Sequence, residues 1–273
     1  MARTVLITGS STGIGRETAL LFQRLGWNVA ATMRHPDQER ELTRLQRTIC
    51  PRLDVTDPGS IQGTIAETIA KYGAIDALVN NAGYAAVGPF EAASPDHIQR
   101  QFNTNVFGLM NVARAVLPHF RERRQGVLIN VASIGGRVAF PLWSLYHATK
   151  WAVDGFTESL HYELRPFGVR VRLIEPGPIK TDFYTRSMDV VPSTGIPDYD
   201  AFAGKTLRRM NDAGMNGAPA SQVAHVIYRA AVASGWRLRY ATDLAGWGIL
   251  FLRRLLPDCI FHAIVRASLR PFP

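Results

Sequence analysis

The sequence alternates short runs of β-branched residues with stretches in which apolar residues recur every three or four positions. Apolar residues follow helical spacing at 19–25 and again at 223–230. Strands separated by helices pair most readily as a parallel sheet with helices on both faces. Right-handed crossovers then build an α/β, doubly wound sheet of about seven strands. The strand-like runs are 5–7, 28–32, 76–80, 127–131, 169–174 and 239–241.

The length of 273 residues suits one domain, and no linker divides the chain, so one domain is expected over residues 1–273. Residues 183–219 are rich in Pro and Gly and are predicted to form a long irregular loop that acts as a substrate lid. Residues 244–273 are predicted to form an amphipathic helical extension broken at Pro257. We expect the extension to pack on its own domain or on a sister subunit, with peripheral membrane contact as the alternative.

The charge and cysteine content exclude several classes of protein. Lys and Arg number 31 against 22 Asp and Glu, a net charge of +9, but the arginines are scattered and form no basic block, so no nucleic-acid partner is expected. Two cysteines, Cys50 and Cys259, exclude a disulfide scaffold and a multi-cysteine zinc site, and no metal is expected. With no signal segment and no apolar run approaching ~20 residues, a cytoplasmic protein without an integral membrane span is expected.

A glycine-rich loop follows the first strand. It reads Gly9-Ser10-Ser11-Thr12-Gly13-Ile14-Gly15, and a helix is expected from Arg16. Glycines permit a tight turn, and the N–H groups that begin a helix attract phosphate, so the loop predicts a Rossmann-type dinucleotide site. A glycine turn without a ligand is the alternative. The loop also fits the Gly-x-Ser-x-Gly nucleophile elbow of hydrolases, but that motif is not expected on a first strand and does not need Gly15.

The end of the second strand indicates which dinucleotide binds. NAD sites often place an acidic residue there for the ribose hydroxyls, but this strand ends Thr32-Met33-Arg34. Arg34 can form a bidentate pair with a 2′-phosphate, which a carboxylate would repel. The sequence therefore predicts NADP(H), with a solvated surface arginine as the alternative.

Three polar residues form a candidate catalytic group. Ser133 follows a strand, where open α/β sheets place their active sites, and Tyr146 and Lys150 stand four positions apart, on one face of a helix. An ammonium group near a phenol stabilises the phenolate and is expected to lower the pKa of Tyr146 from ~10 toward the range of proton transfer.

With these motifs in order, the sequence resembles the short-chain dehydrogenase/reductase family, in its group called classical, and in particular NADP-dependent hydroxysteroid and retinol-type members. The resemblance extends from Thr4 to about Thr181. The matching residues are Thr8, Gly9, Gly13 and Gly15 of the loop, Asp54-Val55, Asn80-Asn81-Ala82-Gly83, Asn105, Ser133, Tyr146, Lys150 and 176–181. Thr12 departs from a common NADP pattern, which has Lys or Arg at this position, so the NADP(H) prediction depends mainly on Arg34.

The resemblance implies a role for each residue. Tyr146 would exchange the proton of the substrate oxygen, Ser133 would hold that oxygen, Lys150 would lower the pKa of Tyr146 and bind the nicotinamide ribose, and Asn105 would support a water near Lys150. Hydroxyls placed around a developing alkoxide act as an oxyanion hole does. The expected cofactor-binding residues are Gly9, Ser11, Thr12, Gly13, Ile14, Gly15, Arg34, Asp54, Val55, Asn81, Ala82, Gly83, Tyr146, Lys150, Pro176, Gly177, Ile179 and Thr181.

The predicted function is an NADP(H)-dependent oxidoreductase that interconverts an alcohol and a carbonyl. Ser133, Trp143, Tyr146 and Phe183 are the expected substrate contacts. Aromatic residues around the lid suit a hydrophobic small molecule of steroid, retinoid or acyl type, although they could equally anchor the lid to the domain. A non-catalytic NADP(H)-binding sensor is the alternative function. The resemblance also implies a homodimer or homotetramer.

Overall fold

The computed structural model describes residues 2–192 and 196–268. The first residue of the predicted domain 1–273, three residues of the predicted lid and the last five residues of the predicted extension 244–273 therefore lie outside the described residues.

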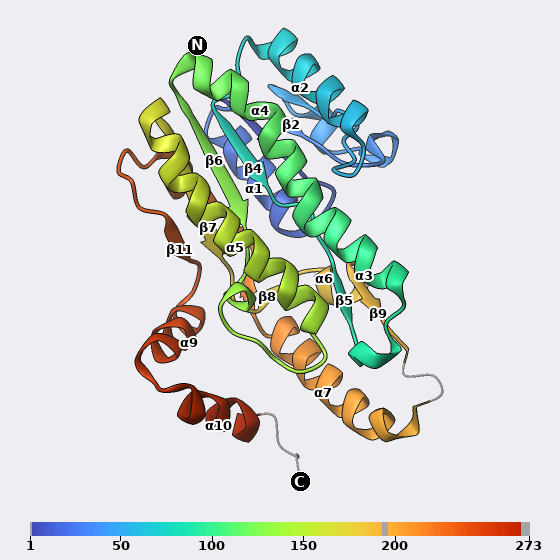
Figure 1. Cartoon of the computed structure of the whole chain (residues 1–273). Coiled ribbons are helices and arrows are strands. Elements are labelled where there is room, and N and C mark those ends of the chain that lie inside the picture. Colours follow the sequence, from blue (N-terminus) through green and yellow to red (C-terminus); the bar gives the residue numbers. More distant parts are fainter. Residues whose placement is uncertain (1, 193–195, 269–273) are drawn as a thin grey trace.

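Seven parallel strands form the central sheet, in the order β3-β2-β1-β4-β6-β7-β11 (Figure 1). All six strand-like runs become strands of this sheet, which confirms the doubly wound α/β fold. The seventh strand, β3, has only two residues, too few to be recognised as a run. The strands are β1 (Thr4–Ile7), β2 (Asn28–Ala31), β3 (Thr48–Ile49), β4 (Ala77–Asn80), β6 (Gly126–Val131), β7 (Val169–Glu175) and β11 (Arg239–Ala241).

Helices cover both faces of the sheet and enclose two large apolar clusters. On one face, α1 (Gly13–Arg24) packs against α8 (Ala220–Val232) around Phe22 and Ile227. On the other, α2 (Pro58–Tyr72), α4 (Leu109–Arg123) and α5 (Ser144–Leu164) enclose a cluster that includes Phe120. Helix α3 (Pro95–Phe102) continues into α4 through a π-helical turn, Asn103–Gly108.

The segment 183–219 is largely regular, so the prediction of an irregular loop is wrong. It contains α6 (Phe183–Arg186), β9 (Met188–Val190), α7 (Pro197–Met215) and β10 (Ala218–Pro219); β9 pairs with β5 (Ala85–Val87) and β10 with β8 (Ile179–Lys180). A glycine costs a helix only ~1 kcal/mol, which packing can outweigh. Gly214 illustrates this, because a Cβ there would lie 2.1 Å from Cζ of Tyr184. Proline is also well tolerated where α7 begins.

The chain ends in a C-terminal helical pair, α9 (Leu244–Leu255) and α10 (Asp258–Ser268), as the amphipathic pattern predicts. Leu250 and Phe261 pack against Ile134, so the pair lies on its own domain. Asp243 caps α9, accepting from the N–H of Gly246 at 2.6 Å, and also accepts from the N–H of Gly177 at 3.3 Å. Among the described residues, no helix has both the length and the apolar character needed to cross a membrane.

A cluster of charged side chains connects β11 to α5 and β7. Arg239 contacts the carboxylates of Asp154 at 2.6 Å, Glu158 at 2.6 Å and Glu175 at 3.2 Å. Burial raises the pKa of Glu175, and the charge of Arg239 opposes that shift. The guanidinium therefore compensates carboxylates that are partly removed from water.

Candidate active site

The glycine loop lines the cavity described below and leads into the first turn of α1. Helix α1 begins at Gly13, three residues before the expected start at Arg16, so the last two glycines belong to its first turn. Gly9 has a φ of +70°, and a Cβ on Gly15 would lie 2.2 Å from the carbonyl oxygen of Gly9. Thr12 precedes the helix without a side-chain capping bond, and unpaired N–H groups at a helix start form an anion site.

The residues after β4 support this loop from behind. Nδ2 of Asn81 donates to the carbonyl oxygens of Thr8 at 3.0 Å and Gly9 at 3.1 Å. The hydroxyl of Thr8 accepts from the N–H groups of Asn81 and Ala82, each at 3.0 Å. Sequence reasoning gave Thr8 no role beyond a motif match. The side chain of Asn81 fixes the loop, and its expected cofactor contact stays a prediction.

Arg34 lies at the cavity edge beyond β2, exposed and without an ion pair in the described part of the chain. Glu39 and Glu41, which follow it along the chain, pair with another cation, because Arg16 contacts Glu39 at 2.6 Å and Glu41 at 2.5 Å. Burial raises the pKa of Glu39, but hydrogen bonds, with Arg16 foremost, outweigh it and lower that pKa to about 2. The guanidinium of Arg34 is therefore available to an anion.

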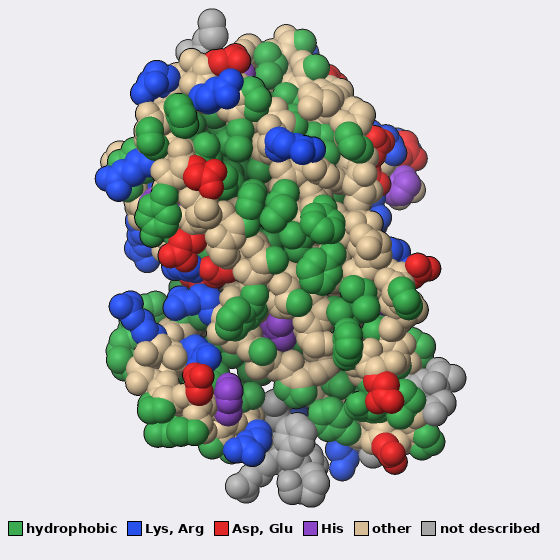
Figure 2. Space-filling model, viewed as in Figure 1, with side chains coloured by type: hydrophobic (Ala, Val, Ile, Leu, Met, Phe, Trp, Pro, Cys, Tyr) green, Lys and Arg blue, Asp and Glu red, His purple; other side chains and the backbone are tan. Residues whose placement is uncertain are grey.

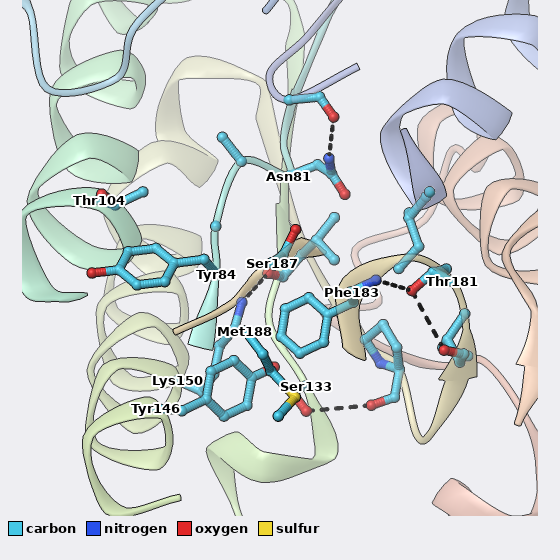
Figure 3. A pocket seen from close by; sticks show the side chains of 18 of the residues that line it. Asn81, Tyr84, Thr104, Ser133, Tyr146, Lys150, Thr181, Phe183, Ser187 and Met188 are labelled. Carbon is cyan, nitrogen blue, oxygen red and sulfur yellow. Dashed lines mark hydrogen bonds between the residues drawn. The ribbon is translucent and has the colours of Figure 1, made fainter. Parts of the chain in front are cut away.

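The three candidate catalytic side chains meet at one end of the cavity (Figure 3). Ser133 follows β6, and its hydroxyl accepts from the N–H of Gly135 at 3.0 Å and donates to the carbonyl of Pro176 at 3.5 Å. Lys150 donates from Nζ to the carbonyl of Val131 at 2.9 Å, with Nζ 5.7 Å from the ring centroid of Tyr146. Tyr146 and Lys150 share one face of α5, as their spacing predicts.

The ionisation of these groups differs from the expectation for Tyr146. Burial raises the pKa of Tyr146, and the Ser133 hydroxyl opposes that rise, whereas the sequence led us to expect a lowered pKa. Burial also lowers the pKa of Lys150 to about 8. The Lys150 ammonium donates to the Val131 carbonyl and lies 5.7 Å from the centroid of the Tyr146 ring. Removal from water is therefore the main cause of both pKa shifts.

Asn105 lies behind the catalytic residues, on the π-helical turn. Its Nδ2 donates to the carbonyl of Tyr84 at 2.8 Å and to the hydroxyl of Thr149 at 3.2 Å, while Oδ1 accepts from the N–H of Tyr84 at 3.1 Å. A π-turn adds a residue to the helix and is frequent at functional sites. Asn105 thus holds the backbone after Gly83 and the residue next to Lys150.

One cavity of about 760 Å³ extends from the glycine loop to Tyr146. Of the residues predicted for the site, only Gly15 and Asn105 do not line it. Sequence reasoning missed several lining residues that α3 and the β5–β9 pairing bring in, and no local motif marks them. Tyr84 is the exception, because it directly follows the Asn80–Gly83 motif. The missed residues include Tyr84, Arg100 and Asp189, whereas Tyr184, Met188 and Met210 were weighed as pocket residues and as lid anchors.

Aromatic side chains form one wall of the cavity. Trp143 packs edge-on against Tyr146, with ring centroids 5.3 Å apart, and parallel to Phe183 at 6.4 Å. The same rings belong to an apolar cluster with Tyr184 and Met210, so they line the cavity and also anchor α6 and α7. The neighbouring His147 is buried between Gly135 and Phe140, and burial lowers its pKa to about 4.

Comparison with known proteins identifies the family. The model of the short chain dehydrogenase family matches residues 3–189. The chain is 35% identical to the uncharacterized oxidoreductase YusZ of Bacillus subtilis over 98% of both chains, and 37% identical to a 3-ketodihydrosphingosine reductase of Bacteroides thetaiotaomicron over 70% of this chain and 69% of that protein. A short-chain dehydrogenase structure from Streptomyces avermitilis superposes with a TM-score of 0.84 at 32% identity, covering 98% and 95% of the two chains. The chain belongs to the short-chain dehydrogenase/reductase family of oxidoreductases.

Structures of this fold hold either nicotinamide nucleotide. ElxO with NADP bound is 26% identical with a TM-score of 0.75, covering 91% of this chain and 100% of that one. A Burkholderia phymatum short-chain dehydrogenase/reductase in complex with NAD is 24% identical with a TM-score of 0.81, covering 100% of this chain and 97% of that one. Proteins of this fold therefore include complexes with NADP and with NAD.

Proposed function

We propose that this protein is an NADP(H)-dependent oxidoreductase that interconverts an alcohol and a carbonyl, with Tyr146 as general acid and base. The observation that carries the proposal is the arrangement along one cavity: Ser133, Tyr146 and Lys150 at one end, the glycine loop and Arg34 at the other. A nucleotide lying between those ends would place its nicotinamide beside the three side chains.

The residues at the nucleotide end fit the dinucleotide. The close approach at Gly15 and the uncapped start of α1 leave backbone N–H groups for the pyrophosphate. Asp54 and Val55 line the place for the adenine, Pro176, Gly177, Ile179 and Thr181 line the place for the nicotinamide, and the unpaired Arg34 suits a 2′-phosphate. When bound, the nicotinamide supplies or accepts the hydride.

The chain's own residues then handle the proton. In the reductive direction Tyr146 donates its hydroxyl proton to the carbonyl oxygen, and its raised pKa keeps that proton in place at neutral pH. Ser133 donates a second hydrogen bond to the same oxygen, because its bond to Pro176 is long at 3.5 Å and easily exchanged. Lys150, held by Val131, places a positive charge beside the ring, which favours the phenolate once the proton has left.

The cavity wall suggests the substrate class. Trp143, Phe183, Tyr184, Met188 and Met210 present apolar surface next to Tyr146, which suits a bulky hydrophobic alcohol or carbonyl. The segment 183–219 supplies four of these five residues, which supports its assignment as the substrate lid. The relative from Bacteroides thetaiotaomicron, a 3-ketodihydrosphingosine reductase by name, is consistent with a substrate carrying a long apolar chain.

Substitution of Tyr146 tests the reaction. Tyr146→Phe removes the proton donor and is expected to lower turnover by at least ~100-fold, while NADPH still binds. The measurement is NADPH oxidation with a panel of hydrophobic ketones, alongside NADPH titration by fluorescence. Tyr162→Phe, an exposed position on the same helix, is the control. Turnover close to that of the unsubstituted protein would contradict the role of Tyr146.

Substitution of Arg34 tests the nucleotide. Arg34→Asp replaces the free cation with a carboxylate that repels a 2′-phosphate, so the ratio of kcat/KM for NADPH to that for NADH is expected to fall by at least ~10-fold. Arg44→Asp changes an exposed arginine that does not line the cavity, with the same change in net charge, and should leave the ratio unchanged. An unchanged ratio in Arg34→Asp would remove Arg34 as the phosphate ligand.

A further inference from the structure

The C-terminal helical pair exposes apolar side chains that its own domain does not cover. On α9, Leu244 is 88% exposed, Trp247 54%, Phe251 45% and Leu255 60%. At about 100° per residue, these positions form one stripe along the helix, and the buried Leu250 lies roughly a quarter turn away from it. Figure 2 shows hydrophobic side chains gathered on this lobe, with basic side chains beside them.

The stripe continues onto α10 through Ile260 and Ile264, which are 47% and 45% exposed. The rings of Trp247 and Phe251 stack with centroids 5.1 Å apart and planes 11° apart, both facing outward. Such a surface, spread over two consecutive helices, exceeds the scattered exposed apolar residues of an ordinary globular protein. A partner with an apolar face would bury it.

The charge of the pair indicates the kind of partner. Within 244–268 there are three arginines and one acidic residue, Asp258. Arg253 forms an ion pair with Asp258. Arg254 and Arg266 are exposed, and neither forms an ion pair with a described residue. A second copy of this chain would bring the same positive charge to the contact, but an anionic surface complements it. Tryptophan beside arginine is the composition of helices that lie at a lipid interface.

We propose that the C-terminal helical pair docks the protein onto an anionic lipid bilayer, with the stripe from Leu244 to Ile264 entering the interface and Arg254 and Arg266 contacting lipid phosphates. The pair also contacts the cavity, because Leu250 and Phe261 pack on Ile134 and Phe140, which line it. Docking thus places the lipid surface next to the active-site wall. The inference stands apart from the proposed reaction, and its test needs no turnover.

The test is cosedimentation of the full chain with phosphatidylcholine vesicles, with and without phosphatidylglycerol, at ~150 mM salt. We expect binding only when phosphatidylglycerol is present. Trp247→Ser should weaken that binding by at least ~10-fold, because the indole no longer enters the interface. Trp151→Ser, on α5 and 49% exposed, is the matched control and should bind as the unsubstituted protein does.

A second variant tests the charge without altering the apolar stripe. Arg254→Glu with Arg266→Glu should weaken binding by at least ~25-fold, since each arginine near an anionic surface contributes about fivefold. Arg24→Glu with Arg44→Glu makes the same change in net charge at exposed positions outside the helical pair and should retain most of the binding. Light scattering on each variant reports the oligomeric state.

Three outcomes would overturn the assignment. One is equal binding, or none, to the two kinds of vesicle. Another is vesicle binding by Arg254→Glu with Arg266→Glu that equals the binding of its control, Arg24→Glu with Arg44→Glu. The third is the absence of vesicle binding combined with a smaller particle for Trp247→Ser, which would show that a second copy of the chain covers the stripe.

Discussion

Replacement of Lys150 by Met should make the protein more stable and inactive. Burial lowers the pKa of Lys150 from 10.5 to about 8, so the folded state holds this ammonium less favourably than the unfolded chain does. The difference corresponds to at most ~3 kcal/mol of unfolding free energy, present in full below pH 8. Lys150→Met removes that cost but also loses the hydrogen bond to Val131, which contributes about 1 kcal/mol. A net gain of ~1–2 kcal/mol is expected at pH 7.

The stability gained by Lys150→Met should depend on pH. Between about pH 8 and 10.5 the unfolded chain keeps the proton that the folded protein has released, so the stability of the unsubstituted protein rises with pH. The advantage of Lys150→Met should therefore be a Tm increase of ~2–8 °C at pH 7 that disappears by pH 10.5. Thermal unfolding by circular dichroism measures it, and Lys71→Met, at an exposed lysine, is the control. A lower Tm at pH 7, or a difference independent of pH, would refute the reasoning.

Two further predictions concern stability. Arg239→Met leaves the carboxylates of Asp154 and Glu175 without their partner and should lower the unfolding free energy by ~3 kcal/mol or more in urea titrations, whereas Arg52→Met, which breaks an exposed pair, should change it by less than ~1 kcal/mol; similar losses would contradict the argument. His147 is held neutral with a pKa of about 4, below 6.5, so the unsubstituted protein should lose up to ~3 kcal/mol as pH falls from 6.5 to 4. His147→Asn should show a smaller fall in Tm between pH 6.5 and 4 than the unsubstituted protein. An equal fall in Tm for the two proteins would contradict the role of His147.

The features that the sequence predicts well are those encoded locally. Strand-forming runs, the glycine loop and the four-residue spacing of Tyr146 and Lys150 each depend on neighbours in the chain, and all are found where expected. The segment 183–219 was misjudged because Gly204 and Gly214 are tolerated inside α7 through packing, such as that of Tyr184, that no local pattern reveals.

The features that the sequence could not predict depend on distant contacts. The pKa of Tyr146 depends on burial and on the direction of the Lys150 ammonium, which the Val131 carbonyl sets from another element. The pair of Arg100 and Asp189 joins residues 89 positions apart at the cavity wall, and only the β5–β9 pairing brings them to 3.3 Å. Arg34, in contrast, was identified from a local pattern, and its nucleotide preference stays a prediction.

Asp243 connects two places that are otherwise separate in the chain. One carboxylate accepts both an N–H in the first turn of α9 and the N–H of Gly177 in the cavity wall. If Gly177 contacts the nucleotide as we propose, a ligand at the C-terminal helical pair that strengthens or breaks the bond to Gly177 changes nucleotide affinity, and bound nucleotide changes the affinity for that ligand by the same factor. Under the two proposals, nucleotide binding and docking of the C-terminal helical pair form one coupled equilibrium, and removing the residues from 243 onward is expected to alter both.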